Sequence, residues 1–316
     1  MIGLSRNLRR HGWRLIFRTV PLFLFLIFML AAVGCQSSRI IEDPSSYELL
    51  PSTLTILDDL EAQEEIMLAF AKAYPEKIGD VEFIDNDWTM MVNGKRFYFA
   101  KGRFLPEELR EQWEDFYPYD FYAYPWTGTP AQRRAEFNNP VYSTGSSFLS
   151  ETLYLSPTED DSWELQEKYS FLGVKMLVHT DIKPLLDLVA EGIRVAAQSD
   201  PSVNEWIAEL RTSPPTFGWN WRAIANTNRR SNHSYGIAID LLPVNLRGRY
   251  TYWQWDASDT VSRDTYYMPP EIVIEAFQNY GFIWGGDWDL IDTMHFEYRP
   301  EILLLNNFDG IFIPGS

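Results

Sequence analysis

The chain has 316 residues and a formal charge of −17, and its single cysteine excludes both an internal disulfide and a thiolate metal cluster. Such acidity argues against a protein that binds nucleic acid or an anionic lipid surface, because both are negatively charged. Hydrophobic residues make up 46% of the chain and aromatic residues 16%, which is enough for a substantial core and excludes a disordered chain.

The first 35 residues have the composition of a targeting segment. Five arginines and no acid precede residue 19, residues 19–33 are nearly all apolar, and the run ends at Ala31-Ala-Val-Gly-Cys35. This apolar run is shorter than the ~20 residues that a membrane-spanning helix needs. Small residues before a cysteine resemble a bacterial lipobox, in which the cysteine is lipidated and becomes the first mature residue.

We therefore expect residues 1–35 to be a lipoprotein signal peptide and Cys35 to carry the lipid that holds the protein to a bilayer. The protein would then be an extracytoplasmic, membrane-anchored lipoprotein of the cell envelope. An uncleaved N-terminal anchor is the alternative. Residues 36–56 are polar and acidic, which is typical of a tether.

Residues 57–170 are expected to form a smaller N-terminal α+β accessory region. Apolar residues at helical spacing predict a helix over residues 57–74. Strand-like residues around Asn93-Gly94, a strong two-residue turn signal, predict a hairpin over residues 81–100. Residues 116–142 are rich in Tyr, Pro and Trp, for which packing against the main domain is favoured over a sugar-binding wall.

Residues 171–316 alternate between helical and strand-like patterns and are expected to form the main domain. Periodicity and Pro or Gly stops predict helices over 181–197, from Asp200 to Leu210, and over 269–280. Apolar runs predict strands at 217–222, 237–242, 282–284 and 294–298. His179 follows an apolar run and is interpreted as a structural histidine.

Two of the three histidines outside the targeting segment lie in settings suited to a metal. His233 and Asp240 flank Gly236 in a short apolar run, and His295 lies in a later one. His233 and Asp240 are an odd number of residues apart, so they cannot share one strand face, and a turn at Gly236 must separate them. Two histidines and an aspartate are the ligand set of a catalytic zinc that keeps one position open for water.

These residues resemble the zinc D,D-carboxypeptidase family, which comprises VanY-type D-alanyl-D-alanine peptidases and their L-alanyl-D-glutamate endopeptidase relatives. The family pattern is Ser-x-His-x-x-Gly-x-Ala-x-Asp, then Trp-Gly-Gly and an acid-x-x-His. Here it is matched by Ser231 to Asp240, by Trp284-Gly-Gly286 and by Asp292-Thr-Met-His295, with Asn220-Trp-Arg222 as an upstream aromatic-arginine element. The resemblance covers about residues 175–300. It implies an α+β fold with a central antiparallel sheet and flanking helices, shared with the hedgehog signalling domain.

By position, the resemblance implies that His233, Asp240 and His295 bind zinc. It places Asp292 as the general base, where carboxypeptidase members often have glutamate and endopeptidases more often aspartate. It implies that Arg222 holds a substrate carboxylate or the developing oxyanion.

Three further residues are expected around this set. Ser231 and Trp284 are expected to contact substrate, and Ser231 is expected to order the turn rather than act as a nucleophile. Glu297 is expected to support a zinc ligand from behind, because it shares a strand face with His295.

The resemblance and the targeting segment together imply a zinc metallopeptidase that hydrolyses amide bonds in peptidoglycan stem peptides. Both D-Ala-D-Ala carboxypeptidase and L-Ala-D-Glu-type endopeptidase activities stay open. Two alternatives are a catalytically weak wall-binding lipoprotein that keeps the peptidase fold and a metal-independent structural lipoprotein. No nucleic-acid partner is expected.

Overall fold

The computed structural model describes residues 59–116, 118–119, 124–126, 147–210, 217–225, 227–256 and 262–315. All of them belong to one compact unit, residues 47–316. Cys35, the targeting segment and the tether lie outside the described residues, so they stay predictions. None of the helices within the described ranges is long and apolar enough to cross a membrane.

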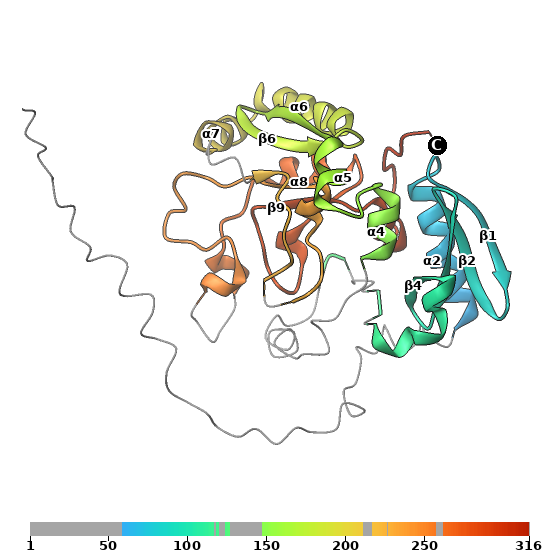
Figure 1. Cartoon of the computed structure of the whole chain (residues 1–316). Helices are drawn as coiled ribbons and strands as arrows, with labels where there is room; N and C mark the ends of the chain where they lie inside the picture. Colours follow the sequence, from blue (N-terminus) through green and yellow to red (C-terminus); the bar gives the residue numbers. More distant parts are fainter. Residues whose placement is uncertain are drawn as a thin grey trace, which may run out of the picture. The chain divides into compact units, whose positions relative to one another are not determined.

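The N-terminal part is a helix packed on an antiparallel meander (Figure 1). Helix α2 (Leu60–Ala73) begins where the Asp59 carboxylate accepts hydrogen bonds from the first backbone amides. It buries Ile66, Met67 and Phe70. The four strands and the following 3-10 helix are β1 (Ile78–Ile84), β2 (Asp87–Val92), β3 (Lys95–Ala100), β4 (Arg103–Pro106) and η2 (Glu107–Asp115).

The hairpin predicted for residues 81–100 is confirmed as part of this larger sheet. Strands β2 and β3 pair in antiparallel register from Val92–Lys95 outward. The two turn residues, Asn93 and Gly94, have φ of 45° and 80°. Two consecutive positive φ angles match the right-handed twist of the strands, which explains why Asn-Gly closes this hairpin.

The rest of the chain builds two smaller antiparallel sheets and their covering helices. The first group is α4 (Phe148–Leu153), α5 (Glu159–Glu164), the hairpin β5 (Gln166–Phe171) and β6 (Val174–His179), α6 (Lys183–Ala197) and α7 (Pro201–Glu209). The second group is η5 (Asn232–Tyr235), β7 (Ala238–Asp240), η6 (Trp253–Trp255), η7 (Arg263–Thr265), α8 (Glu271–Gln278), β8 (Phe282–Trp284), η8 (Gly285–Asp287), β9 (His295–Tyr298) and α9 (Pro300–Leu305). Strand β9 lies between β7 and β8.

The mixed α+β class is confirmed, and the predicted helices form with ends shifted by a few residues. The described strands fall into three small antiparallel sheets, so a single central sheet is not established. The prediction of a strand at residues 217–222 is wrong, because none of these residues lies in a strand. There the backbone amides bond to two different segments: Trp219 donates to Leu177 and Asn220 to His233, so no ladder forms.

One hydrophobic core joins the N-terminal part to the C-terminal part. Buried residues of α2, the meander, α6, α8 and β9 belong to a single cluster. The Tyr74 ring meets Tyr154 and Tyr298 edge-on, with ring centroids 6.4 and 6.1 Å apart. Helix α2 also contacts α9. The accessory region predicted for residues 57–170 therefore shares its buried surface with the main domain.

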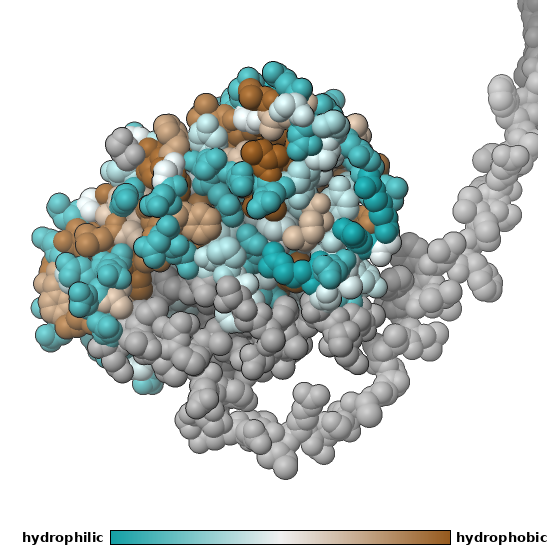
Figure 2. Space-filling model, turned by 180° about the vertical axis from the view of Figure 1, so that it is seen from behind, coloured by the Kyte–Doolittle hydropathy of each residue, from teal (hydrophilic) through white to brown (hydrophobic). Residues whose placement is uncertain are grey.

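The face turned away from the view of Figure 1 carries interspersed apolar and hydrophilic side chains (Figure 2). Leu188 and Val195 of α6 are among the exposed large apolar residues of the described part, at 41% and 54% exposure. Single exposed apolar residues are normal on a soluble surface.

We expect Phe70→Ala to lower the free energy of unfolding by about 3–5 kcal/mol, because it leaves a cavity among buried aromatic rings of the core. Phe70 is 1% exposed and contacts the rings of Phe104 and Tyr119. Urea denaturation would measure the change. Leu68→Ala is the control, since Leu68 lies on the same helix and is 51% exposed. An equal loss in both variants would contradict the burial of Phe70 in the core.

Candidate metal centre

Two paired strands and one tight turn bring the three predicted metal ligands together. Asp240 ends β7 and lies directly opposite His295, the first residue of β9. His233 lies on η5, which ends at Gly236 with a φ of 69°. A Cβ at Gly236 would lie 1.9 Å from the Gln166 side chain, so the turn requires glycine for space as well as for conformation. The turn expected between His233 and Asp240 is therefore present.

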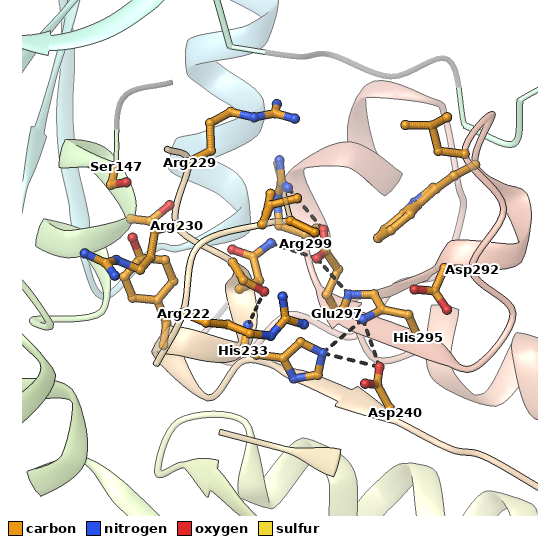
Figure 3. Close-up of a pocket in the computed structure, with 18 of the residues that line it drawn as sticks. Ser147, Arg222, Arg229, Arg230, His233, Asp240, Asp292, His295, Glu297 and Arg299 are labelled. Atoms are coloured by element: carbon orange, nitrogen blue, oxygen red, sulfur yellow. Dashed lines mark hydrogen bonds and ion pairs between the residues drawn. The ribbon is translucent and has the colours of Figure 1, made fainter. Parts of the chain in front are cut away.

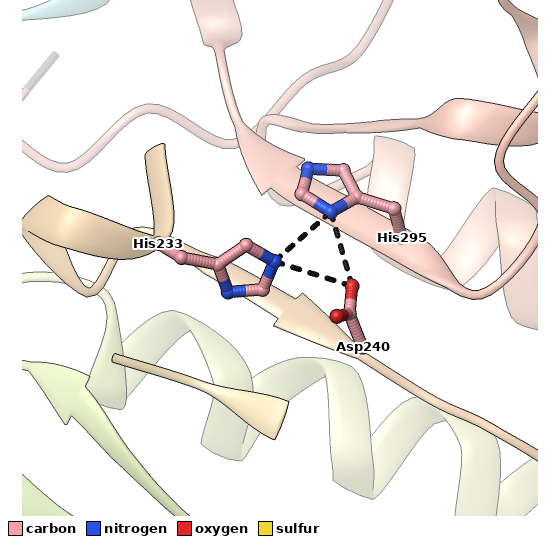
Figure 4. Close-up of side chains that lie close together, drawn as sticks. All are labelled: His233, Asp240 and His295. Carbon is pink, nitrogen blue, oxygen red and sulfur yellow. Dashed lines mark hydrogen bonds and ion pairs between the residues drawn. The ribbon is translucent and has the colours of Figure 1, made fainter. Parts of the chain in front are cut away.

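The ligand atoms form a small triangle (Figure 4). The Nε2 atom of His233 lies 3.2 Å from Nδ1 of His295 and 3.3 Å from Oδ1 of Asp240. His295 Nδ1 lies 3.1 Å from the same carboxylate oxygen. Ligands at ~2.05 Å from a tetrahedral zinc are separated by about 3.3 Å, so the triangle has the size that zinc requires.

The other ring nitrogens fix which atoms face inward. His233 Nδ1 lies 2.7 Å from the Gly218 carbonyl oxygen, and His295 Nε2 lies 3.0 Å from Oε2 of Glu297. Both partners accept hydrogen bonds, so each histidine carries its proton on the outer nitrogen. The three inner atoms are then all lone-pair donors that face one another, an arrangement that a cation stabilises.

The electrostatics of the cluster also favour positive charge. Burial disfavours a charged imidazole, yet hydrogen bonds and charges from Asp240 and Glu297 raise the pKa of His295 to about 10. Burial likewise opposes ionisation of Asp240, but the two histidines lower its pKa well below the usual value. These three residues could hold a metal ion, and they fit the predicted zinc by donor type, spacing and charge.

Asp292 lies beside the cluster with an unused acceptor. Its Oδ1 atom is buried and has no hydrogen-bond partner among the described residues. Burial raises the pKa of Asp292 to about 7, with Asp240 adding to the rise and His295 opposing it. An unpaired buried carboxylate oxygen is costly unless a ligand or water binds there.

The Trp284-Gly-Gly motif explains how Asp292 reaches this place. The Asp292 amide donates to the Gly285 carbonyl at 2.9 Å. A Cβ on Gly285 would lie 2.5 Å from the Asp292 carbonyl oxygen, and one on Gly286 would lie 2.1 Å from the Trp284 ring. Only glycines permit this close packing, so the motif is a structural support for the loop that carries Asp292.

Trp284 does not line the pocket, which corrects the expectation that it contacts substrate. Its side chain is 1% exposed, stacks on Phe296 and donates from Nε1 to the Thr293 carbonyl at 3.0 Å. Trp288 lines the pocket instead, with its ring centroid 5.1 Å from that of His295. Both tryptophans lie near the motif, and spacing alone could not tell which one faces the pocket.

Ser231 and Arg222 both reach the pocket. Ser231 caps η5, its hydroxyl accepting from the His233 amide at 3.4 Å, as expected for a residue that orders the turn. Arg222 is exposed and extends toward the metal ligands (Figure 3). It makes no ion pair with any described residue. His179 is buried between the Tyr154 carbonyl and the Asp181 amide, in agreement with a structural role.

The pocket in front of the cluster has a volume of about 460 Å³. Its walls come from both parts of the chain. The N-terminal part contributes residues that the sequence did not single out, namely Arg103, Phe104, Pro118, Tyr119, Ser147, Leu149 and Ser150.

A buried hydrogen-bond network runs from the metal cluster to the N-terminal part. Behind His295, the Glu297 carboxylate accepts from Asn232 at 2.8 Å and from Arg299 at 3.3 Å. Burial opposes its ionisation, but the contact with His295 and the charge of Arg299 lower the pKa of Glu297 to about 2. Glu297 therefore lies behind His295, on the side away from the other two candidate ligands.

Arg299 continues the network toward α2. It also bonds to Glu301 and to the Tyr119 hydroxyl. The Glu301 carboxylate in turn accepts from Tyr119 at 3.0 Å and from Tyr74 at 2.7 Å. Arg299 and Glu301 were not predicted as part of the site from the sequence. Their charges directly precede the apolar residues 302–305, and this was the one local indication that they are buried.

Glu297→Gln is expected to weaken zinc binding by about 10–100-fold, because an amide holds the outer nitrogen of His295 less strongly than a carboxylate. Competition with a chromogenic chelator would measure the affinity. Glu275→Gln, on the solvent side of α8, is the matched control for loss of one acid. Unchanged affinity in Glu297→Gln would rule out support of the ligand through His295.

Comparison with known families agrees with this geometry. Residues 225–298 match a family model described as D-alanyl-D-alanine carboxypeptidase, and this range includes the whole metal cluster, Asp292 and Glu297. Residues 67–121 match a domain of unknown function, which includes Tyr74 and Tyr119. No solved structure matches the chain. The match over residues 225–298 supports the peptidase family to which the sequence motifs pointed, with a possible metal-binding triad at its centre.

Proposed function

We propose that this protein is a zinc-dependent peptidase that hydrolyses amide bonds next to D-residues in peptidoglycan stem peptides. One observation carries the proposal: the unpartnered Asp292 oxygen lies beside three inward-facing ligand atoms at the base of a pocket. The family match supports the peptidase class. The choice of peptidoglycan rests on the description of that family and on the targeting segment.

The residues present suit hydrolysis of a peptide bond. Zinc held by His233, Asp240 and His295 would supply polarisation of the scissile carbonyl and a lowered pKa for water. Asp292 would take a proton from the attacking water and give it to the leaving amine. A carboxyl group whose pKa is about 7 can both accept and donate a proton near neutral pH.

Arg222 would bind a substrate carboxylate or the developing oxyanion. Its guanidinium offers a planar fork of donors that matches a carboxylate in two hydrogen bonds. Its Nη1 donates to the Ala223 carbonyl at 3.4 Å. It makes no ion pair with the described residues, so the rest of the fork is available to a ligand.

The proposal includes the finer features expected from the sequence. The domain at residues 171–316 would be a hedgehog/D,D-peptidase-like domain, supported by the three-stranded antiparallel sheet that carries Asp240 and His295. The chain would be held in the cell envelope by a lipid on Cys35, which the composition of residues 1–35 supports.

Mass spectrometry of muropeptides incubated with the zinc-loaded protein tests the activity. Loss of one alanine from the pentapeptide would establish a D,D-carboxypeptidase, and a cut between L-alanine and D-glutamate would establish an endopeptidase. A chelator should abolish either product, and added zinc should restore it. No cleavage by zinc-loaded protein would contradict the proposal and favour a wall-binding lipoprotein.

Asp292→Asn should keep zinc but lower kcat about 10²–10⁴-fold, because the amide cannot accept the proton. In the wild-type protein, kcat/KM should fall as the pH falls through the pKa of Asp292, since the protonated carboxyl is no longer a base. Stopped assays with matched zinc content would measure both. Retained turnover in Asp292→Asn would refute the assignment of this residue as the base.

Arg222→Ala should raise KM or lower kcat/KM about 10–100-fold while zinc content stays the same, because two charge-assisted hydrogen bonds to the substrate are lost. Steady-state kinetics and metal analysis would measure the two effects. Arg249→Ala serves as the charge-matched control, since Arg249 does not line the pocket. Equal kinetics in wild type and Arg222→Ala would contradict the role of Arg222.

A further inference from the structure

The pocket has a cationic wall that the proposed chemistry does not fully use. Arg222, Arg229 and Arg230 all line it, although the chain as a whole has a charge of −17. Three of the four carboxylates that line the pocket, Asp240, Asp292 and Glu297, lie together at the metal side (Figure 3). The arginines therefore form a separate, positively charged part of the same pocket.

The three arginines come from one short antiparallel loop whose pairing fixes their directions. Ala223 pairs with Arg230, flanked by hydrogen bonds from the Ile224 amide to the Arg229 carbonyl at 2.8 Å and from the Ser231 amide to the Arg222 carbonyl at 3.1 Å. Side chains alternate along such a pair. Arg222 and Arg229 are thus diagonal neighbours on one face, about 7–8 Å apart, and Arg230 lies on the other face.

Arg230 is held within the protein. Its guanidinium stacks on the Trp221 ring at 4.1 Å, and its charge acts on the carboxyl of Glu151. Figure 3 shows its side chain extending away from the metal side. Arg230 is therefore a structural residue of the loop.

Arg229 is not held in this way. Its side chain extends in the same general direction as that of Arg222 and away from that of Arg230 (Figure 3). The Nε atoms of Arg229 and Arg230 are both buried without a hydrogen-bond partner among the described residues, but only the Arg230 guanidinium stacks on a ring. No described residue makes an ion pair with the Arg229 guanidinium. A buried donor left unpaired is costly, and a ligand that supplied an acceptor would remove that cost.

We propose that Arg229 is a second anion subsite of the pocket, which binds a carboxylate of the peptide substrate several ångströms from the group held by Arg222. This inference rests on the proposed peptidase function. It specifies the substrate as an acidic peptide with two carboxylates, one at or near the scissile bond and one on a glutamyl residue farther along. Arg229 binds the second in a fork of charge-assisted hydrogen bonds, so it selects substrate without taking part in bond cleavage.

The test measures binding of two synthetic stem pentapeptides that end in D-alanyl-D-alanine and differ only at the glutamyl residue. One has the free carboxylate and the other the carboxamide. Isothermal titration with full-length, zinc-loaded Asp292→Asn protein keeps the peptides intact. We expect the free acid to bind at least about 10-fold more tightly, because a charge-assisted bond is stronger than a neutral one.

Adding Arg229→Gln to the Asp292→Asn protein should reduce the preference for the free-acid peptide to less than about 2-fold. Binding of the carboxamide peptide should stay unchanged. Arg229→Lys, which keeps the charge but loses the fork, should give an intermediate preference. Arg194→Gln removes the same charge from an exposed position on α6 and should keep the full preference. Zinc content and thermal unfolding of each variant verify that it is folded.

Equal binding of the two peptides, no binding of either, or a full preference in Arg229→Gln would each overturn the subsite. The proposed function is judged separately by hydrolysis of the carboxamide peptide by the wild-type chain. Hydrolysis without an acid preference would leave the peptidase standing and remove the subsite. Tighter binding of the free-acid peptide, without hydrolysis by the wild type, would leave the subsite standing and remove the peptidase.

Discussion

The buried carboxylate of Glu297 is the contact on which the arrangement of the site depends. It lies between the outer nitrogen of His295 and the guanidinium of Arg299, so it joins a candidate metal ligand to the interior of the protein. A buried charge is tolerated only when it is paired and hydrogen-bonded, and removal of one partner from such a pair typically costs about 3–5 kcal/mol. Glu297 meets this condition through three donors, and its partner Arg299 meets it through Glu301 and Tyr119. The geometry of the metal cluster is thereby connected to the packing of the N-terminal part.

This connection gives residues 67–121 a physical role, although the domain model that they match is of unknown function. Tyr74 and Tyr119 end the hydrogen-bond network on the N-terminal side, and Tyr119 also lines the pocket. The region therefore contributes to the site in two ways, as a wall of the pocket and as the outer end of the support behind His295. Because its aromatic residues share one core with the C-terminal part, the two parts are expected to stabilise each other.

Much of the site could be predicted from the sequence because its signals are local. The ligand triplet, the turn at Gly236 and the place of Glu297 behind His295 follow from spacing, strand alternation and the need for positive φ. The hairpin at Asn93-Gly94 and the helix that begins after Asp200 follow from equally local rules. The direction of the Trp284 side chain could not be predicted in this way. Trp284 packs inward against Gly286, whereas Trp288 faces the pocket. Side-chain direction in an irregular loop depends on contacts with residues far away in the chain.

The sequence by itself determined the chemical types of the candidate metal ligands, because these depend on residue identity and on spacings of a few positions. Its resemblance to the zinc peptidase family implied the α+β class and the candidate base. Tertiary structure alone decided that the N-terminal part walls the pocket and that Arg299 and Glu301 continue the support behind Glu297. It also decided that Arg230, unlike Arg229, stacks on the Trp221 ring. The pocket wall and the support behind Glu297 rest on contacts between segments far apart in the chain, such as that of Tyr74 with Glu301, 227 residues away. No periodicity in the sequence encodes such a pairing, because it arises only when separate elements bury their apolar faces against one another.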